Sequence, residues 1–473
     1  MQPKTTTLDD LVSLAKRRGF VFQTSSIYGG LANSYDYGPL GTELLRNIKN
    51  LWWQKFIHQR PDMVGLDSQI LLHPKTWMAS GHTTAFNDPL VEDLTTQKRY
   101  RADHLIEEWQ EKNNQTTDTS PEDMSVKAMD EYIIQHKIVS PDGNPVSAVK
   151  VFNLLFETSI GVVTGEKSKI YLRGETAQGI FSNFANISNS TRMQLPFGVG
   201  QIGKSFRNEV TTGQFVFRTL EFEQAEIEYF FDPETTDWQT LMESWKTAMW
   251  EFVTKDLHIA AKNLRWRKHT DTERSHYSMD TYDLDYKFPF GWKELWGIAY
   301  RTDYDLKQHQ EYSGETLQAT TTDNTRRFTP HVIEPAVGIN RLFMMVLAEH
   351  YWEDTERSRT VLCLPRQLSP HSVAVFPLAR NKPELIAAAK IIYQELLGKI
   401  PTTWDDRSNI GKRYLYQDEI GTPFCITIDY QTLEDNTVTI RNRDTTEQTR
   451  IGSNQILEYL AKKLDLAEEA VLG

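Results

Sequence analysis

Residues 206–222, FRNEVTTGQFVFRTLEF, carry a cation, an acceptor and an aromatic ring at a spacing that could surround a nucleotide. Arg207 and Glu209 close one apolar run, a glycine-containing bend follows, and a second apolar run carries Arg218 and Phe222. Arginine can hold a phosphate oxygen in a fork of donors, a carboxylate can accept from an exocyclic amine, and a phenyl ring can stack on a purine. Taken alone, however, the stretch is better interpreted as an ordinary hairpin with a charged tip.

A second segment, residues 330–345, supports the nucleotide interpretation. It places Gly338 and Arg341 at the head of an apolar pattern with helical spacing. The N-terminus of a helix attracts anions, and an arginine beside it adds a second donor for a phosphate. The two segments together predict a nucleotide site built from a hairpin and a helix start.

The elements that position these residues read as an antiparallel sheet. Four runs between residues 151 and 306 have strand character, and no alternation of strand and helix typical of a parallel sheet interrupts them. Within the run 222–229 one face is polar and predicted to line the pocket, and the other is packed; the two faces are Phe222, Gln224, Glu226 and Glu228 against Glu223, Ala225, Ile227 and Tyr229. Because the chain lacks the alternation of strand and helix that such folds need, a Rossmann or P-loop nucleotide site is not supported.

The two nucleotide segments resemble motifs 2 and 3 of class II aminoacyl-tRNA synthetases. Further segments narrow the resemblance to the glycyl-tRNA synthetase family of the single-polypeptide, homodimeric type. They follow one another over nearly the whole chain: KRRGFVFQTSSIYGG at 16–30, YDYGPLG at 35–41, YRADHLIEE at 100–108, LRGETAQGIF at 172–181, EFEQAEIEYFF at 221–231, the stretch 291–314, and the stretch 409–429. So many matches in order make chance similarity implausible.

The resemblance implies an α+β fold. Residues 1–365 would form a class II catalytic domain, an antiparallel sheet flanked by helices, and residues 366–473 an α/β anticodon-binding domain. Residues 92–150 are expected to be a polar insertion with weak helices near 102–111 and 121–137 and a mobile loop near 112–122. The apolar stripe of 41–57 corresponds in the family to a helix at the dimer interface, and it fits a helix packed on its own sheet equally well.

The resemblance also implies that the chain binds ATP. Arg207 would contact the α-phosphate and the reacting carboxylate, and Glu209 would bind the adenine amino group. Phe222 would stack on one face of the base, and Arg341 would cover the other face. Arg207, Glu209 and Arg341 are the expected catalytic residues. Glu294 is the candidate ligand of Mg²⁺, although a surface carboxylate is an equally good interpretation of it. The full expected ATP set is Arg207, Asn208, Glu209, Phe217, Arg218, Thr219, Leu220, Glu221, Phe222, Glu294, Leu295, Gly338, Ile339, Asn340 and Arg341.

Glycine must be selected by excluding larger amino acids, because it has no side chain to hold. The family crowds the α-carbon with carboxylates, which here align with Glu175, Glu223 and Glu334, and Arg101 aligns with a contact to the substrate carboxylate. Several acidic groups around one small cavity are costly without a cation, which favours a ligand-binding role. The full expected substrate set is Arg101, Glu175, Phe222, Glu223, Gln224, Ala225, Glu226, Glu334, Pro335, Ala336, Val337 and Gly338.

Three positions depart from the usual family pattern. Gly174 stands where the family has proline, Leu220 where it has arginine, and Ala336 where it has serine. Gly174 is expected to loosen the backbone beside Glu175. Ala336 lacks a hydroxyl that faces the amino acid in the family, so rate and amino-acid selectivity are the properties that these departures are expected to affect.

Bulk composition indicates a cytoplasmic protein without a membrane span. The N-terminus lacks the apolar core of a secretion signal, and no apolar run reaches the length that crosses a bilayer. Two distant cysteines, Cys363 and Cys425, indicate buried thiols in a reducing compartment. The net charge of −12 is not that of a general nucleic-acid binder, so tRNA(Gly) is implied by the resemblance alone. Local basic clusters at 262–268 and 407–413 are possible contacts, although solvated surface is the better interpretation of each.

Two other functions remain open from the sequence. A non-catalytic, synthetase-like nucleic-acid-binding accessory protein is one, although such relatives tend to lose the arginines corresponding to Arg207 and Arg341. A class II ligase for another small amino acid is the second, and the alanine at 336 keeps it open. The main interpretation is a glycine–tRNA ligase that uses ATP and Mg²⁺ and acts as a homodimer.

Overall fold

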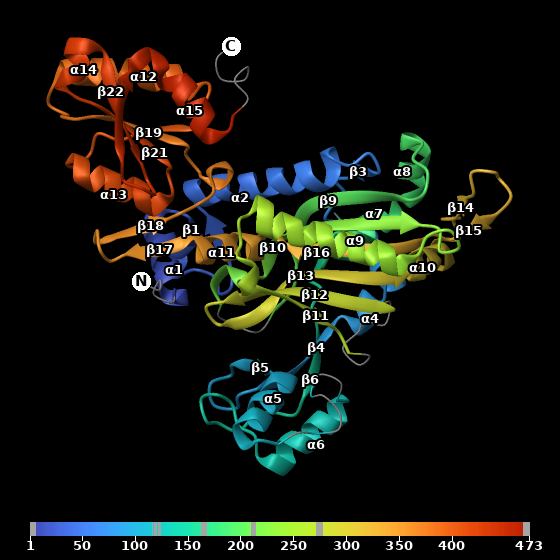
Figure 1. Ribbon diagram of the computed structural model, residues 1–473. Helices are drawn as coiled ribbons and strands as arrows, with labels where there is room; N and C mark the ends of the chain where they lie inside the picture. Colours follow the sequence, from blue (N-terminus) through green and yellow to red (C-terminus); the bar gives the residue numbers. More distant parts are fainter. Residues whose placement is uncertain are drawn as a thin grey trace.

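The computed structural model describes residues 6–115, 117, 121, 124–161, 168–209, 214–270 and 278–466. A seven-stranded sheet forms its centre, with neighbours antiparallel except for the parallel pair at one edge (Figure 1). In spatial order its strands are β11 (Leu264–Lys268), β12 (Asp280–Phe288), β13 (Gly291–Thr302), β16 (His331–Gly338), β10 (Glu221–Phe231), β9 (Phe197–Phe206) and β3 (Met63–Gly65). This is the antiparallel sheet predicted from the sequence.

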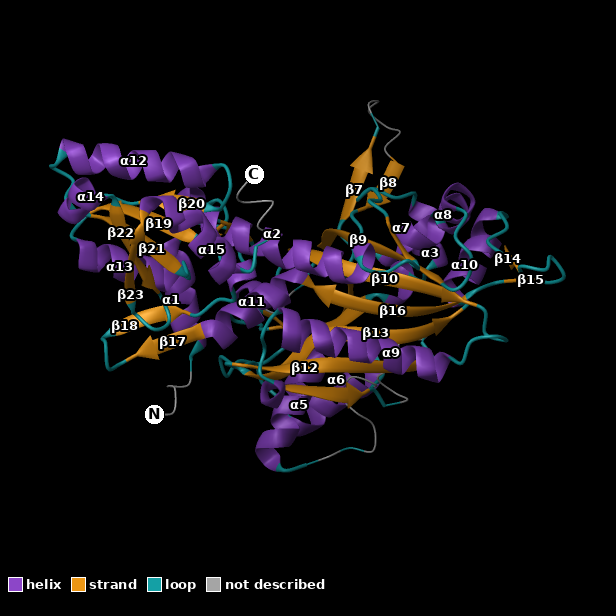
Figure 2. Cartoon of the chain, turned by 45° about the horizontal axis from the view of Figure 1, so that its top comes forward, coloured by secondary structure: helices purple, strands orange, loops and turns teal. Residues whose placement is uncertain are grey.

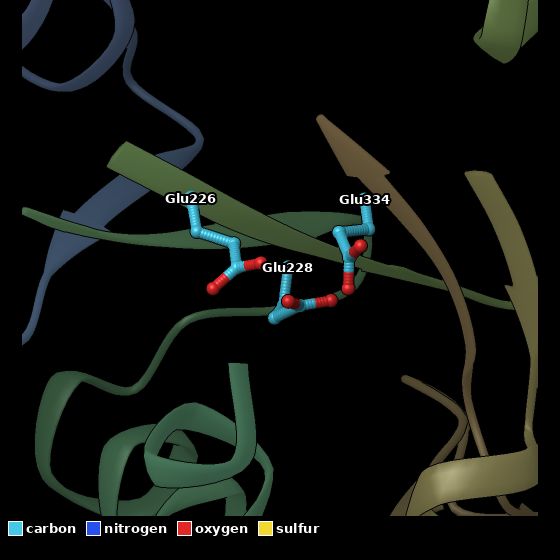
Figure 3. A group of neighbouring side chains, drawn as sticks. All are labelled: Glu226, Glu228 and Glu334. Atoms are coloured by element: carbon cyan, nitrogen blue, oxygen red, sulfur yellow. The ribbon is translucent and has the colours of Figure 1, made fainter. Parts of the chain in front are cut away.

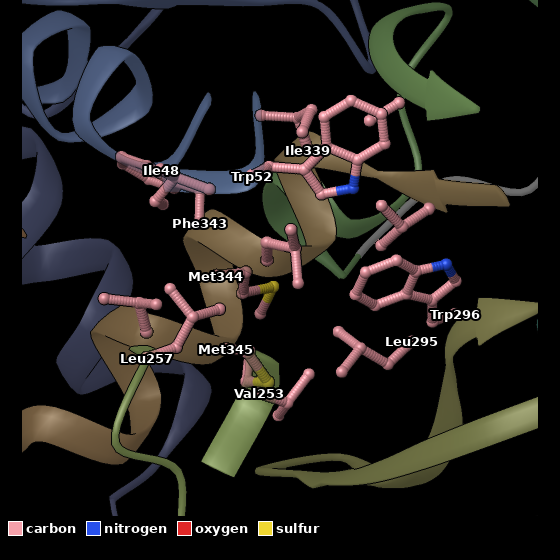
Figure 4. Packing of buried hydrophobic residues seen from close by; sticks show 14 of the residues in the cluster. Ile48, Trp52, Val253, Leu257, Leu295, Trp296, Ile339, Phe343, Met344 and Met345 are labelled. Atoms are coloured by element: carbon pink, nitrogen blue, oxygen red, sulfur yellow. The ribbon is translucent and has the colours of Figure 1, made fainter. Parts of the chain in front are cut away.

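One face of the sheet packs against long helices and holds the main hydrophobic core. These helices are α1 (Leu8–Arg18), α2 (Pro39–Trp53), α9 (Trp238–Glu251) and α11 (Ile339–His350). Ala225, Ile227 and Tyr229 face this core from β10, as their alternation predicted. Figure 4 shows α11 between the helix that carries Ile48 and Trp52 and the residues Leu295 and Trp296 of the sheet.

The apolar stripe of α2 is buried within its own chain. Leu44, Ile48 and Trp52 belong to the main core, and α2 contacts α11. The stripe is therefore explained by packing on the chain's own sheet and gives no independent sign of a dimer interface.

The opposite face of the sheet carries shorter helices that cover only one end of it. α7 (Ala177–Ser182), α8 (Phe184–Thr191) and α10 (Tyr304–Ser313) form a second hydrophobic cluster with Phe197, Phe230 and Val332, and α3 (Pro74–Ala79) packs against α7 and α10. The other end of this face stays open above β10, β13 and β16.

Four small strand pairs lie around the sheet: β1 (Val21–Gln23) with β2 (Tyr35–Tyr37), β7 (Glu157–Ile160) with β8 (Ser168–Tyr171), β14 (Ala319–Thr320) with β15 (Arg327–Phe328), and β17 (Tyr351–Asp354) with β18 (Arg359–Leu362).

The insertion between the first helices and the sheet has a core of its own. Its elements are β4 (Asn87–Glu92), β5 (Arg99–Arg101), α5 (Ala102–Asn113), α6 (Val126–His136) and β6 (Lys150–Asn153), which extend away from the sheet in Figure 1. Val91, Ile106, Met129 and Ile133 are among the residues that form this small core. The expectation of a polar insertion was therefore incomplete, because α5 and α6 each bury an apolar side in this small core. Part of the loop predicted near 112–122, namely residues 116, 118–120 and 122, lies outside the described residues, as do residues 210–213 of the hairpin bend.

The C-terminal part is the predicted α/β unit with a mixed sheet (Figure 2). Its strands, in spatial order, are β20 (Thr402–Trp404), β19 (Val373–Pro377), β21 (Phe424–Ile428), β22 (Thr437–Asn442) and β23 (Gln448–Gly452); its helices are α12 (Pro383–Leu397), α13 (Ile410–Ile420), α14 (Tyr430–Asp435) and α15 (Ile456–Leu464). It has its own hydrophobic cluster, although Ile420 and Leu368 pack into the main core. The proposed boundary at residue 366 therefore divides two units that share apolar contacts.

Four members of the two basic clusters, Arg265, Arg267, Lys268 and Arg413, bond to other groups of the chain. Arg265 and Arg267 lie opposite Asp285 and Asp283 on β12 and form ion pairs with them, and Lys268 pairs with Asp280. Arg413 is buried and donates to backbone carbonyls at Pro377, Asp406, Arg407 and Ser408. The described helices include none long and apolar enough to cross a bilayer.

Candidate active site

A cavity of about 230 Å³ lies on the open face of the central sheet. Strands β10, β13 and β16, the strand ends on either side of the hairpin, and the start of α11 supply its walls. Its lining residues are Glu175, Arg207, Glu209, Phe217, Arg218, Thr219, Phe222, Gln224, Glu226, Thr281, Glu294, Gly297, Ile298, Ala299, Glu334, Ala336, Gly338, Asn340 and Arg341. The two segments singled out in the sequence therefore meet in one cavity, although more than a hundred residues separate them.

One end of the cavity is cationic and aromatic. Arg207 follows β9, its Nε donates to the Gly174 carbonyl at 3.1 Å, and its guanidinium lies 5.5 Å from the Phe222 ring centre and 5.1 Å from that of Phe86. A guanidinium held by a carbonyl and two rings keeps a fixed direction while its remaining donors stay available to an anion. Gly174, expected only to loosen the backbone, thus contributes an acceptor that orients Arg207.

Arg341 lies across the cavity on the first turn of α11. Its Nη1 is 3.1 Å from the Glu294 carboxylate and also donates to the Glu294 carbonyl, and its guanidinium lies 4.6 Å from the Phe217 ring centre. The Arg341 charge, opposed by burial, lowers the pKa of the Glu294 carboxyl, so this side chain is ionised at neutral pH. On the near side Glu209 lies 4.0 Å from Arg218. These positions agree with the nucleotide end predicted from the sequence.

The other end of the cavity is acidic and deep. Glu175, Glu226 and Glu334 line it and are all buried. Glu226 accepts from the backbone N–H of Thr176 at 2.9 Å and from Gln224 Nε2 at 3.0 Å, and the Thr176 hydroxyl also bonds to it. Small residues, Gly297, Ala299 and Ala336, form the wall beside these carboxylates. The space is therefore both negatively charged and restricted in size.

Four buried residues that sequence reasoning did not single out hold the carboxylates in place. Arg301 Nη1 donates to Glu334 at 2.6 Å, and its Nε and Nη2 each donate to Asp305 at 2.8 Å. Gln178 Nε2 donates to Glu175 at 2.9 Å and to Asp305 at 3.0 Å. The fourth, His82, lies 3.3 Å from the other Glu175 oxygen. Gln178, Arg301 and Asp305 lie in the segments 172–181 and 291–314 that carry the family resemblance, whereas His82 lies outside every such segment.

The acidic groups differ in how readily they ionise. Burial and the neighbouring Glu175 raise the pKa of Glu226 to about 7, and burial, only partly offset by Arg301, raises the pKa of Glu334 to about 8. Burial acts in the same direction on Glu175, but His82, Arg301 and Gln178 outweigh it and leave the pKa of that carboxyl below its ordinary value. A cation entering the cavity would favour ionisation of all three groups.

Glu223 does not line the cavity, which corrects the expectation that it crowds the substrate. It lies on the other face of β10, where Lys49 of α2 donates to both of its carboxylate oxygens at 2.9 and 3.1 Å. Glu226 occupies the position beside Glu175 and Glu334 that was expected for Glu223. The same alternation places Ala225, Pro335 and Val337 away from the cavity, because they flank residues that line it on β10 and β16.

Several other residues predicted to bind ATP or the amino acid do not line the cavity. Arg101, predicted to hold the substrate carboxylate, is in the insertion and pairs with Asp88 and Asp103. Leu295 and Ile339 are fully buried in the main core, and Glu221 pairs with Lys204. Asn208 and Leu220 do not line the cavity, although the Leu220 carbonyl accepts from the Arg207 N–H and thereby fixes the chain at that point. Of the ATP set, Leu295 and Ile339 fall outside the cavity because they lie on the buried face of their strand and helix.

Comparison with known proteins agrees with this geometry. The family described as tRNA synthetase class II core domain (G, H, P, S and T) matches residues 161–351, and the family described as Anticodon binding domain matches residues 372–463. A glycine–tRNA ligase of Caldanaerobacter subterraneus subsp. tengcongensis is 47% identical, with 98% of this chain and 99% of the relative covered. The chain belongs to the glycine–tRNA ligase family. Glycine–tRNA ligases of Staphylococcus epidermidis (47% identical; 97% of this chain and 99% of the relative) and Staphylococcus aureus (45%; 96% and 98%) are similarly close.

The two matched families correspond to the two structural units of the chain. The class II core match covers β9, β10, β13 and β16, which carry the cavity, and the anticodon-binding match covers the whole mixed sheet of the C-terminal unit. The α+β architecture, the class II core and the anticodon-binding unit predicted from the sequence are confirmed.

Proposed function

We propose that this chain activates glycine with ATP to form glycyl-adenylate and transfers the glycyl group to the 3′ end of tRNA(Gly). The observation that carries the proposal is the cavity itself, which joins a cationic, aromatic end at Arg207, Phe222 and Arg341 to a buried acidic end at Glu175, Glu226 and Glu334. An aminoacyl-adenylate of glycine has the matching arrangement, with a phosphate and a purine on one side and an ammonium group on the other.

In the first step a glycine carboxylate oxygen attacks the α-phosphorus of ATP, and the bond to pyrophosphate breaks. In this proposal Arg207 neutralises charge on the α-phosphate and the attacking carboxylate, and Arg341 binds the γ-phosphate; that both arginines line the cavity supports these roles. Phe222 offers its face to the adenine, and Glu209 can accept from the adenine amino group. Neither partner requires a protein nucleophile, so fixed placement and charge stabilisation carry the rate.

Mg²⁺ is part of the proposal through Glu294. Mg²⁺ is usually bound by one or two protein carboxylates together with substrate phosphates and waters, and it would neutralise phosphate charge in this cavity. The Glu294 carboxylate is ionised and lies beside Arg341, so it fits the role of a single protein ligand.

The acidic end would hold the glycine ammonium group. Glu175, Glu226 and Glu334 lose much of their electrostatic cost when a cation enters, so the site favours an ammonium group over a neutral ligand. A side chain on the substrate α-carbon would meet carboxylates that Arg301, Gln178 and Thr176 hold in place. Selection of glycine therefore rests on size as well as charge.

In the second step a ribose hydroxyl of the tRNA 3′ end attacks the glycyl carbonyl, and AMP leaves. The family match at 372–463 supports recognition of the anticodon by the C-terminal unit, where Arg407 and Lys412 are exposed. We also propose a homodimer in the cytoplasm. The exposed apolar side chains Ile27, Tyr28 and Leu31 support a covered surface, and the free thiols of Cys363 and Cys425 support a reducing compartment.

Amino-acid-dependent exchange of pyrophosphate into ATP tests the function. Glycine should support exchange far better than alanine or serine, and the same preparation should charge tRNA(Gly). Exchange with another small amino acid in preference to glycine would favour the second ligase hypothesis. Absence of exchange with every amino acid, together with retained nucleic-acid binding, would favour the non-catalytic accessory protein.

A further inference from the structure

Glu228 is a buried carboxyl group for which the proposed adenylation chemistry has no use. It lies two residues beyond Glu226 on the same face of β10, and its side chain is wholly buried. Neither of its carboxyl oxygens has a hydrogen-bond partner among the described residues. A buried polar group of this kind requires an explanation, because an unpaired charge inside a protein is strongly disfavoured.

The groups around Glu228 are mostly acidic. The register that pairs Glu226 with Ala336 and Tyr229 with Ile333 places Glu228 directly opposite Glu334 on β16. One oxygen from each of Glu226, Glu228 and Glu334 lies within 4.8 Å of the others, and Figure 3 shows Glu228 between the other two. The remaining charged neighbours are Arg301 of β13, which donates to Glu334 and Asp305, and Asp305 of α10 itself.

Ionisation of all three glutamates would leave like charges opposite one another among buried groups. Like charges directly across an antiparallel pair destabilise a sheet, and two carboxylates that share a site do not both ionise readily. A protonated carboxyl group resolves the conflict, because it has one O–H donor and can donate to a neighbouring carboxylate. Glu228 is the member of the cluster best suited to hold the proton, since it is deepest and its oxygens have no other donor.

We propose that Glu228 is a neutral carboxylic acid at neutral pH and that, once the substrate ammonium group has favoured ionisation of Glu334, its O–H donates to the Glu334 carboxylate and fixes it for that ammonium group. Glu228 is then a positioning residue for glycine, and the inference rests on the proposed function of the cavity. Burial, with a further contribution from Glu334, raises the pKa of Glu228 well above its ordinary value, which agrees with this assignment. With the Glu228 carboxyl group neutral, Glu334 can carry the negative charge that binds the ammonium group, and the total charge of the cluster stays low.

Two substitutions of similar size separate a neutral donor from an ionised carboxylate. Glu228→Gln keeps a neutral donor, so the KM for glycine should stay within a few-fold of the parent value. Glu228→Met removes the donor and should raise the KM for glycine by about 10- to 100-fold, the typical effect of losing a hydrogen bond to a charged group. The KM for ATP should change little in either variant, because Glu228 lies at the acidic end. Equal damage by both substitutions, or no effect of Glu228→Met, would overturn the proposal.

Infrared spectroscopy gives a readout that does not depend on activity. A protonated carboxyl group absorbs at a higher C=O frequency than a carboxylate, so the parent protein at neutral pH should show such a band, and Glu228→Gln should lose it. A parent spectrum unchanged by Glu228→Gln would contradict the proposal even if Glu228→Met failed to fold. Binding of Mg²⁺ or Mn²⁺ without ATP, lost in Glu228→Gln, would show a cation site instead. If the parent exchanged no pyrophosphate with glycine, the proposed function would fail, while the band would still decide the state of Glu228.

Discussion

The Nε2 atom of His82 lies 3.3 Å from a Glu175 carboxylate oxygen, and both side chains are buried. His82 Nδ1 lies 2.8 Å from the Ser80 hydroxyl, which is itself buried and donates to the Trp77 carbonyl at 3.4 Å. Ser80, His82 and Glu175 thus contact one another in the order of a catalytic triad. Ser80 is only 2% exposed, however, so it cannot act as a nucleophile on a substrate. The contact between His82 and Glu175 instead orients the Glu175 carboxylate, and Gln178 donates to its other oxygen.

This contact predicts a selective effect on glycine. His82→Phe should raise the KM for glycine by about 10- to 100-fold, because Glu175 loses a charge-assisted partner. The KM for ATP should remain near the parent value, since His82 lies behind the acidic end. His82→Gln, which retains a donor, serves as the matched control and should restore part of the affinity. Pyrophosphate exchange at varied glycine and ATP measures both constants, and an equal rise in the two would contradict the assignment.

Arg207 should matter for chemistry and little for folding. Arg207→Ala should lower the rate of adenylate formation by about 10²- to 10³-fold, the usual loss when one electrostatic contact at a reacting centre is removed. Its side chain is only partly buried, so thermal unfolding should stay close to that of the parent. Arg207→Lys, which keeps the charge without the fork of donors, should be intermediate. Normal exchange by Arg207→Ala would show that the hairpin does not hold the reacting phosphate.

Glycine affinity and the stability of the unliganded protein should change with pH in opposite directions. The folded pKa values of about 7 for Glu226 and about 8 for Glu334 exceed the ordinary value of 4.5, so folding takes up protons at these groups. Their contribution to stability is complete below about pH 4.5 and is lost as pH rises through 7 and 8. The KM for glycine should fall over the same range, because the ionised carboxylates bind the ammonium group.

The pH prediction has two measurable parts. The melting temperature of the unliganded protein should fall between pH 6 and pH 8.5, and saturating glycine should reduce that fall. Glu175 should not contribute in this range, since its pKa is lowered and its ionised form persists into acid. A double substitution of Glu226 and Glu334 by glutamine serves as the control, which should flatten the dependence of stability on pH. A glycine KM that rose from pH 6 to pH 8.5 would contradict the interpretation.

Asp418 should stabilise the contact between the C-terminal unit and the catalytic core. It is wholly buried on α13 and accepts from Arg359 of β18 at 2.8 Å and from Arg441 of β22 at 2.8 and 2.9 Å. Asp418→Ala leaves two buried guanidinium groups without this partner and should cost about 3–5 kcal/mol in the free energy of unfolding. Denaturant unfolding measures the loss, and Glu434→Ala, at an exposed site on α14, should cost little. Similar values for the two variants would show that the buried Asp418 carboxylate contributes nothing to stability.

Ala336 should set how strictly alanine is excluded. It lines the cavity opposite Glu226 in the register of β10 and β16, so a serine hydroxyl there would occupy space beside the substrate α-carbon. Ala336→Ser should increase the preference for glycine over alanine, by up to the roughly 10- to 200-fold that one methylene can contribute. Parallel exchange assays with glycine, alanine and serine measure the ratio. Unchanged selectivity would remove Ala336 from the specificity argument, and comparable use of alanine and glycine by the parent would contradict the glycine assignment.

Local pattern was sufficient for the elements and for three side chains, Arg207, Phe222 and Arg341, that line one cavity. The alternation of 222–229 predicts a strand with a polar and a packed face, and the apolar spacing after Gly338 predicts a helix, because both patterns follow from backbone periodicity alone. Arg207, Phe222 and Arg341 belong to short segments whose residue types are unusual together, and for that reason their spacing indicated a shared ligand before any contact was visible.

The acidic end depended on which face of the sheet each helix covers and on strand register. Glu223 and Glu226 are equally acidic in the sequence, but α2 covers one face and supplies Lys49 to Glu223, so only Glu226 reaches the cavity. Pairing of β10 with β16 places Glu228 opposite Glu334, and the chain brings His82 to Glu175 from a distant segment. Side-chain chemistry and periodicity are local properties that the sequence determined for this protein; contacts between distant segments depend on how packed layers exclude water, and only the tertiary structure decided them.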